Sequence, residues 1–209
     1  EENSSDLKIK DYPNSKDLIL KNILFKYEGP NSEKVLDNIT LRIPANKTTA
    51  IVGKSGSGKT TIIKLILGFY ELIEGDILID KISLKRYSAA EWRKKCGVVM
   101  QEGFIFSDSI ANNIALDDSL IDIRKLNNAI KTANITDFVE SLPLGVETKI
   151  GGNGHGLSSG QKQRILIARA VYKNPDYLFF DEATNSLDTE NEKIIMNNLS
   201  SFFKNRTVL

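Results

Sequence analysis

A short glycine-rich stretch, GKSGSGKT from Gly53 to Thr60, limits this chain to a small set of folds. It matches the pattern G-x-x-x-x-G-K-[ST] in full. The run before it, residues 48–52, is β-branched and apolar, and the run after it, residues 61–67, places apolar side chains on one face at helical spacing. Because a phosphate-binding loop joins a strand to a helix, the sequence predicts a nucleotide site at this turn.

The residue types in this loop indicate what each position does. Glycines allow backbone conformations in which successive N–H groups point inward at an anion, and the following helix adds the positive end of its dipole. Lys59 is expected to reach the β- and γ-phosphates, and the hydroxyl of Thr60 to ligate Mg²⁺. The loop residues predicted to contact the nucleotide are Gly53, Ser55, Gly56, Ser57, Gly58, Lys59, Thr60 and Thr61.

Two other apolar runs, each predicted to be a buried strand, end in polar residues that suit a metal–nucleotide site. YLFF at 177–180 is followed by Asp181 and Glu182, and GVVM at 97–100 by Gln101. Asp181 is expected to hold Mg²⁺, Glu182 to act as general base on the attacking water, and Gln101 to contact the metal or its water. Each string alone also fits an ordinary turn or loop; the P-loop in the same chain favours the functional interpretation.

The composition excludes several classes of protein. With 28 basic and 27 acidic residues among 209, the chain has no charge excess for a broad nucleic-acid surface. Its single cysteine, Cys96, cannot form an internal disulfide and is expected to be buried and unreactive, as in a reducing compartment. The best apolar run, residues 62–73, is interrupted by Lys64 and Glu71, so no membrane span is predicted.

The alternation of apolar runs and turn residues predicts an α/β fold: a P-loop NTPase core with a mixed sheet, an antiparallel β flap at the N-terminus and an inserted helical subdomain. Residues 1–16 are read as a linker to an upstream region, 17–209 as the domain and about 104–172 as its helical subdomain. The predicted elements are β-rich runs at 17–27 and 35–43 around a turn at 28–32, a turn at 74–76, a strand at 77–79, helices at about 89–95, 109–116, 122–133, 135–141, 159–173 and 189–203, and a strand starting near 207. A capping box of Ser88 and Glu91 is expected to start the helix at 89, and Asp188 to cap the one at 189.

The string LSSGQ, Leu157 to Gln161, makes the identification more specific. It resembles the LSGGQ signature of the ATPase domain of ATP-binding-cassette (ABC) transporters, with Ser159 in place of the first glycine. P-loops occur in many enzymes, but the order P-loop, Gln101, LSSGQ-KQR, FFDE and SLD is similar to this family over about residues 17–209.

The resemblance implies further site residues. Tyr27 matches the aromatic residue that stacks on adenine, with Val35 beside it; the alternative is a tyrosine of the core or of an edge strand. Gln101 matches the glutamine that senses the metal and contacts a transmembrane domain. The signature residues Ser158, Gly160 and Gln161 are expected at the ATP held by the opposite subunit, and Asp188 at the dimer interface.

The resemblance also implies ligands and partners. ATP and Mg²⁺ would be bound between two nucleotide-binding domains, expected to be identical chains, whose closure drives a transmembrane domain. That domain is expected upstream in the same protein. The ATPase domain itself is expected at the cytoplasmic face of the cell membrane, as part of an integral membrane transporter, with no nucleic-acid partner. The motifs are most similar to exporters, with bacterial peptide and bacteriocin exporters, with or without a peptidase domain, as candidates.

Three departures from the family pattern affect these expectations. The switch histidine that follows the last strand in the family is absent before the chain stops at Leu209, so the fragment is expected to hydrolyse ATP weakly. His155, the only histidine, does not match it and is assigned to a loop or interface. Gly152 and Asn153 stand where exporters usually carry a glutamate.

Two other functions are compatible with these motifs. A soluble ABC-type ATPase acting on DNA or ribosomes shares them, but the near-zero net charge and the lack of coiled-coil heptads between the motifs argue against it. A regulatory module that binds nucleotide without hydrolysis is disfavoured by the presence of Glu182.

Overall fold

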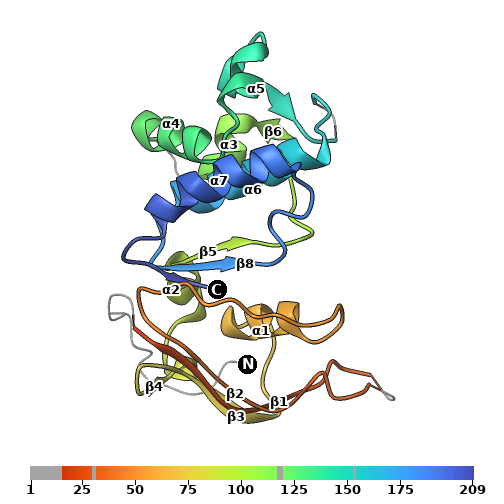
Figure 1. Cartoon of the computed structure of the whole chain (residues 1–209), viewed down its shortest axis with the longest axis vertical. Helices are drawn as coiled ribbons and strands as arrows, with labels where there is room; N and C mark the ends of the chain where they lie inside the picture. The colour runs from red at the N-terminus through yellow and green to blue at the C-terminus, as the bar shows by residue number, and fades with distance from the viewer. Residues whose placement is uncertain (1–15, 30–31, 117–119, 153) are drawn as a thin grey trace, which may run out of the picture. The chain divides into compact units, whose positions relative to one another are not determined.

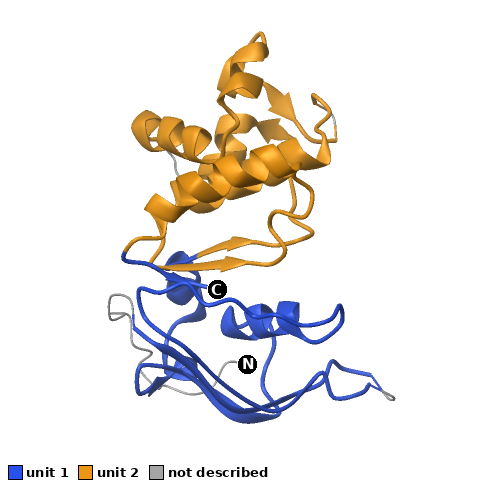
Figure 2. Ribbon diagram, viewed as in Figure 1, with its two compact units in different colours: residues 1–96, 205–209 blue, residues 97–204 orange. Residues whose placement is uncertain are grey.

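The chain folds into two compact units in the computed structural model, which describes residues 16–29, 32–116, 120–152 and 154–209 (Figures 1 and 2). The first unit comprises Glu1–Cys96 and Asn205–Leu209, and the second Gly97–Lys204. Except for Lys16, the predicted linker 1–16 lies outside the described residues, as do Asn153 and part of the predicted turn at 28–32.

The first unit is built on a four-stranded antiparallel sheet in the order β2-β1-β3-β4. Its strands are β1 (Leu18–Phe25), β2 (Leu36–Ile43), β3 (Glu74–Ile79) and β4 (Ile82–Ser83). Leu18 and Leu20 of β1 and Ile77 and Ile79 of β3 alternate with more exposed residues and form a buried apolar face. The predicted antiparallel β flap is confirmed.

Two helices, a 3₁₀ turn and the C-terminal strand complete this unit. They are α1 (Lys59–Ile66), η1 (Leu84–Arg86), α2 (Ala89–Lys94) and β9 (Thr207–Val208). The buried indole of Trp92 in α2 donates a hydrogen bond to the carbonyl of Ile66, 2.7 Å away, and so ties α2 to the end of α1. Cys96 is buried as expected, and its thiol donates to the carbonyl of Trp92.

Three local predictions in this unit were wrong or incomplete. The run before the P-loop forms no strand; within it, Thr48 makes an isolated parallel bridge to Val208 of β9. The predicted turn at 74–76 is instead the beginning of β3. Ser88 precedes α2 without a side-chain capping bond, and the carboxylate of Glu91, the other half of the predicted box, accepts from Lys94 Nζ at 2.7 Å.

Gly75 meets β1 at a point where only glycine fits. It has φ +87°, and a Cβ there would lie 2.4 Å from the carbonyl oxygens of Lys21 and Asn22. We expect Gly75→Ala to lower the free energy of unfolding by about 3 kcal/mol or more, because left-handed strain adds to a backbone clash. Gly68→Ala is the control. Gly68 also has a positive φ, +68°, but a Cβ built there has nothing within 4 Å, so this change should lower the free energy of unfolding by only about 1–2 kcal/mol. Equal losses in urea denaturation would contradict the clash.

The second unit packs helices beside the strands β5 and β8. Its elements are β5 (Cys96–Val99), whose first residue belongs to the first unit, β6 (Asp108–Ser109), α3 (Ile110–Ala115), α4 (Ile123–Thr132), α5 (Thr136–Ser141), η2 (Gly145–Glu147), β7 (Lys149–Ile150), α6 (Ser159–Tyr172), β8 (Tyr177–Phe180) and α7 (Thr189–Phe202). Helix α6 is central: α3 and α4 pack on it, and its residues 165–168 are buried. The helices predicted at 109–116, 122–133, 135–141, 159–173 and 189–203 are confirmed within two residues at each end. In the described part of the chain, no helix is both long and apolar enough to cross a membrane.

Candidate nucleotide-binding site

The P-loop lies in the first unit, between residue 52 and helix α1. Gly56 and Gly58 have φ of +79° and +89°, and Gly58 is the N-cap of α1. A Cβ at Gly58 would lie 2.7 Å from Leu36 Cδ2 and 3.3 Å from the carbonyl oxygen of Val35. The absence of a side chain at 58 therefore lets the loop lie against the start of β2, which places Val35 beside the loop.

Lys59 sits at the centre of the curled loop. Its Nζ donates to the carbonyl oxygens of Gly53 and Lys54, both at 3.1 Å, and the amide of Ser57 donates to Lys54 O at 3.2 Å. Helix α1 begins at this lysine and has no acidic residue in its first turn, so no carboxylate of that turn neutralises the positive end of its dipole. The loop combines a cation with a helix N-terminus, which is the arrangement that binds phosphates.

Tyr27 lies near the P-loop helix and is supported on several sides. Its hydroxyl is 3.0 Å from Thr61 Oγ1, and its ring packs edge-on against Phe25 and Tyr70, with centroid distances of 5.0 and 5.2 Å. Thr61 is itself buried, at 5% exposure. The tyrosine predicted to stack on adenine is thus in contact with a residue predicted to bind the nucleotide.

In the second unit, the two predicted strand-end residues lie at one edge. The amide of Asp181 donates to the carbonyl of Val99 at 2.8 Å, so β5 and β8 end side by side. Asp181 is buried, at 4% exposure, whereas Gln101, two residues beyond β5, is exposed. An aspartate and a glutamine that follow the carboxyl ends of neighbouring strands carry the oxygen ligands that a hard cation prefers.

Glu182 has a backbone conformation that is unusual for a residue with a side chain. Its φ is +50°, and its side chain is solvent-exposed, with Oε2 accepting from Asn185 Nδ2 at 2.8 Å. A short turn follows, closed by the amide of Asn185 donating to Glu182 O at 3.2 Å. Left-handed non-glycine residues cost energy and cluster at functional sites, so the turn holds this carboxylate in a defined place.

The signature segment begins α6 with a complete capping box. Gln161 N donates to Ser158 Oγ at 3.2 Å, and Ser158 N donates to Gln161 Oε1 at 2.9 Å. A Cβ at Gly160 would lie 3.4 Å from the carbonyl oxygen of Ser186, so the signature and the SLD segment are neighbours within this unit. The S-x-x-Q spacing at 158–161 could have predicted this box from sequence.

A polar network around Asn191, which sequence reasoning missed, joins the SLD segment to α6. Asn191 donates to both carboxylate oxygens of Asp188, through its backbone N–H at 2.9 Å and its side chain at 2.7 Å. Asn191 Oδ1 accepts from Arg164 Nη1 of α6 at 3.2 Å and from Asn134 Nδ2 at 2.9 Å. The bond from Asn191 N to Asp188 is the helix cap predicted at Asp188, whereas no local pattern indicates the contacts with Arg164 and Asn134, which are far from Asn191 in the chain.

The backbone and side-chain hydrogen bonds from Asn191 hold the pKa of the Asp188 carboxyl below its ordinary value. Asp188 therefore contributes stability that is present above the ordinary carboxyl range and is lost as the pH falls through its lowered pKa. We expect Asn191→Ala to raise the pKa of Asp188, followed by NMR of the side-chain carboxyl. Asn198 lies on the same helix, and its side-chain amide donates to the carbonyls of Lys131 and Thr132. Asn198→Ala should therefore leave the pKa of Asp188 unchanged. A pKa of Asp188 that is the same in Asn191→Ala would contradict the network.

The remaining predicted residues occupy simple positions. Ser55 and Ser57 are exposed in the P-loop, and Thr60 is in the first turn of α1. His155 is exposed, and its amide donates to Lys149 O at 2.8 Å, in the segment between β7 and α6.

A P-loop on a helix N-terminus in an α/β fold defines a P-loop nucleotide-binding protein.

Comparison with known proteins narrows this class to one family. The ABC transporter family pattern matches residues 36–185. The chain is 44% identical over 193 residues to the ATP-dependent lipid A-core flippase of Haemophilus influenzae (strain 86-028NP), covering 92% of this chain and 33% of that protein. It is also 44% identical over 190 residues to ABC transporter B family member 1 of Arabidopsis thaliana, covering 91% of this chain and 15% of that protein.

A solved structure of a bacterial Atm1-family ABC exporter with ATP bound superposes with a TM-score of 0.88 at 36% identity, covering 93% of this chain and 34% of that one. The chain belongs to the ABC transporter family. It has the fold of that family's ATP-binding, ATP-hydrolysing domain, and it spans about a third of the length of the flippase relatives.

Proposed function

We propose that this chain is the motor domain of a membrane exporter, which binds and hydrolyses Mg-ATP to drive transport. The observation that carries the proposal is the pairing of the capped signature helix with the SLD segment at Gly160 and Ser186, in a chain that also has a P-loop. The P-loop alone is common to many enzymes, whereas the signature is what distinguishes this family. We also infer that residues 17–209 form one ATPase domain, with a helical subdomain at about 104–172.

The chain's own residues suit each part of the reaction. Lys59 binds the β- and γ-phosphates, Tyr27 stacks on adenine beside Val35, and the other P-loop residues donate to the phosphates. Thr60, Asp181 and Gln101 offer hydroxyl, carboxylate and amide oxygens, which is the ligand type that Mg²⁺ prefers. Mg²⁺ held by these residues would neutralise phosphate charge. Glu182 accepts the proton of the attacking water.

The signature residues are proposed to act on the ATP of a second, identical domain. Ser158 is exposed and is the N-cap of α6, and the positive end of a helix dipole favours an anion at that position. Gly160 and Gln161 lie in the first turn of that helix, and Asp188 lies in the segment packed beside it. Two ATP molecules would thus be enclosed between two domains, and their hydrolysis would let the two domains separate.

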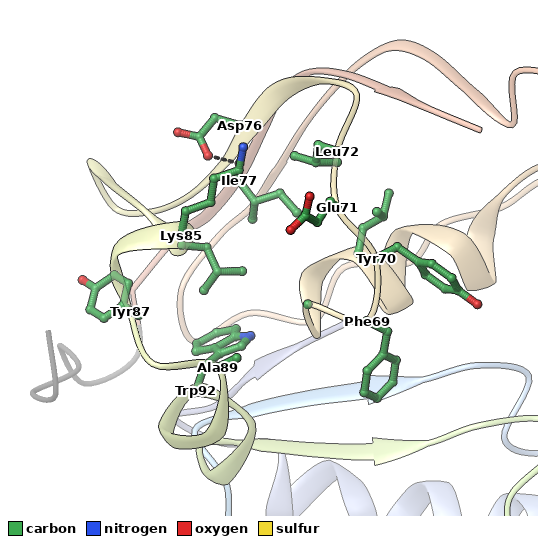
Figure 3. Close-up of a pocket in the computed structure, with 13 residues that line it drawn as sticks. Phe69, Tyr70, Glu71, Leu72, Asp76, Ile77, Lys85, Tyr87, Ala89 and Trp92 are labelled. Carbon is green, nitrogen blue, oxygen red and sulfur yellow. Dashed lines mark hydrogen bonds between the residues drawn. The ribbon is translucent and has the colours of Figure 1, made fainter. Parts of the chain in front are cut away.

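A pocket of the first unit is the surface at which we place a transmembrane domain (Figure 3). It has a volume of about 630 Å³ and lies between the end of α1, β3 and α2. Phe69 of its lining is 55% exposed, and Ile73, one residue beyond Leu72 of the lining, is 50% exposed, so this segment presents apolar side chains at the surface. Glu71, Asp76 and Lys85 add polar groups to its lining. An amphipathic segment with apolar anchors and a few charges would fit such a surface.

We infer the membrane domain from the part of the flippase relatives that this chain does not cover, and the cargo from their names and from the motifs. Because the chain spans about a third of each flippase relative, we infer a fused transmembrane domain and a location at the cytoplasmic face of the membrane. The motif resemblance makes peptides one candidate cargo. The flippase relatives, named for lipid A-core, make an amphiphilic lipid the second.

The test uses the full-length protein in vesicles with Mg-ATP. Transport of a fluorescent lipid or of a labelled peptide should depend on ATP and stop in a variant without Lys59. The exporter assignment would be contradicted if the rate of ATP hydrolysis stayed the same on insertion into vesicles and on addition of either cargo.

A further inference from the structure

Tyr70, just beyond α1, contacts the tyrosine that is proposed to stack on adenine. Phe25, Tyr27 and Tyr70 form an aromatic cluster in which Tyr27 meets the other two rings nearly at right angles, at 84° and 86°. Tyr70 also contacts Phe25, with the centroids 5.7 Å apart. Edge-to-face contacts of this kind fix the orientation of a ring as well as burying it.

The supports of Tyr27 differ in how firmly they are held. Phe25 and Thr61 are buried, at 3% and 5% exposure, and belong to β1 and α1. Tyr70 is 43% exposed and lies in the segment between α1 and β3. It is therefore the support that a change at the surface can most readily displace.

Tyr70 also belongs to the lining of the pocket described above. In Figure 3 its ring points away from the pocket, whereas Glu71 and Leu72, the next two residues, lie along the pocket wall. In this short segment, Glu71 and Leu72 thus face the pocket, while Tyr70 contacts Tyr27. If the transmembrane domain proposed to bind at this pocket displaced the backbone of this segment, the ring of Tyr70, which supports Tyr27, would move.

We propose that Tyr70 is a positioning residue that holds Tyr27 for adenine and links occupancy of the pocket to the affinity for ATP. This inference rests on the proposed function, in which Tyr27 stacks on adenine. It predicts an effect confined to the base of the nucleotide, because Tyr70 supports Tyr27 and not the phosphate-binding loop. By thermodynamic linkage, adenine binding should in turn alter the pocket.

The first experiment measures the dissociation constants of Mg-ATP and of Mg-triphosphate, which has no base, by calorimetry on this chain. Tyr70→Ala should weaken ATP binding about threefold to tenfold and leave triphosphate binding unchanged. Tyr70→Phe, which keeps the ring, should bind ATP normally. Leu72→Ala, which removes an apolar pocket side chain outside the aromatic cluster, is the matched control and should also bind ATP normally. Unchanged triphosphate binding shows that each variant is folded.

Tyr27→Ala separates the two proposals. If it weakens ATP but not triphosphate, and Tyr70→Ala in that background has no further effect, the inference is supported. If Tyr27→Ala is selective for ATP and Tyr70→Ala is not, only the role of Tyr70 is overturned. If Tyr27→Ala leaves ATP binding unchanged, the stacking assignment fails and this inference fails with it.

Trp92, the only tryptophan of the chain, lines the pocket and reports on the linkage. ATP should change its fluorescence more than triphosphate does, and Tyr70→Ala should remove that difference while Tyr70→Phe keeps it. Equal changes with ATP and triphosphate in the unaltered chain would overturn the link to the pocket.

Discussion

Replacing Lys59 with alanine should weaken the binding of ATP by roughly 100-fold or more. Each hydrogen bond from an ammonium to a phosphate oxygen contributes about 1.5–3 kcal/mol, and two such bonds account for a loss of this size. The geometry agrees with this role, since the P-loop already curls around Nζ through the carbonyls of Gly53 and Lys54. Calorimetry with Mg-ATP on this chain measures the loss.

Two variants control for effects on the loop itself. Lys64→Ala removes a lysine from the last turn of the same helix and should bind ATP normally. Lys59→Met keeps the aliphatic stem without the charge and should bind as poorly as Lys59→Ala. ATP affinity that is unchanged in Lys59→Met would show that the P-loop does not bind phosphate through this residue.

Replacing Glu182 with glutamine should slow ATP hydrolysis by about 10²–10⁴-fold and leave ATP affinity nearly unchanged. Glutamine retains an oxygen that can accept from Asn185, so the turn is preserved, but it cannot take the proton of the attacking water. The rate should be measured in the full-length protein, because the proposed reaction takes place between two domains of an assembled exporter.

Glu190→Gln is the matched control, since it neutralises an exposed carboxylate in the first turn of α7. It should hydrolyse ATP at the normal rate. A Glu182→Gln protein as fast as this control would remove Glu182 as the general base. A protein that is slow only because it no longer binds ATP would assign Glu182 to binding instead.

The order of motifs along the chain was enough to predict the family and much of the fold. The P-loop, the signature and the acidic strand end are local patterns, and each depends on residues within a few positions of one another. The box at Ser158 and Gln161 is of the same kind, because an N-cap and its N3 partner are three residues apart. Amphipathic spacing likewise predicted the helices that pack around α6.

Contacts between distant segments were decided only by the tertiary structure. Gly75 reads as part of a turn, but the close approach of β1 places it in a strand. Asn191 meets Arg164, and Tyr70 meets Tyr27, because folding brings remote side chains together. Local spacing encodes helices, strands and caps, whereas the choice of partner across the fold depends on the packing of the whole unit.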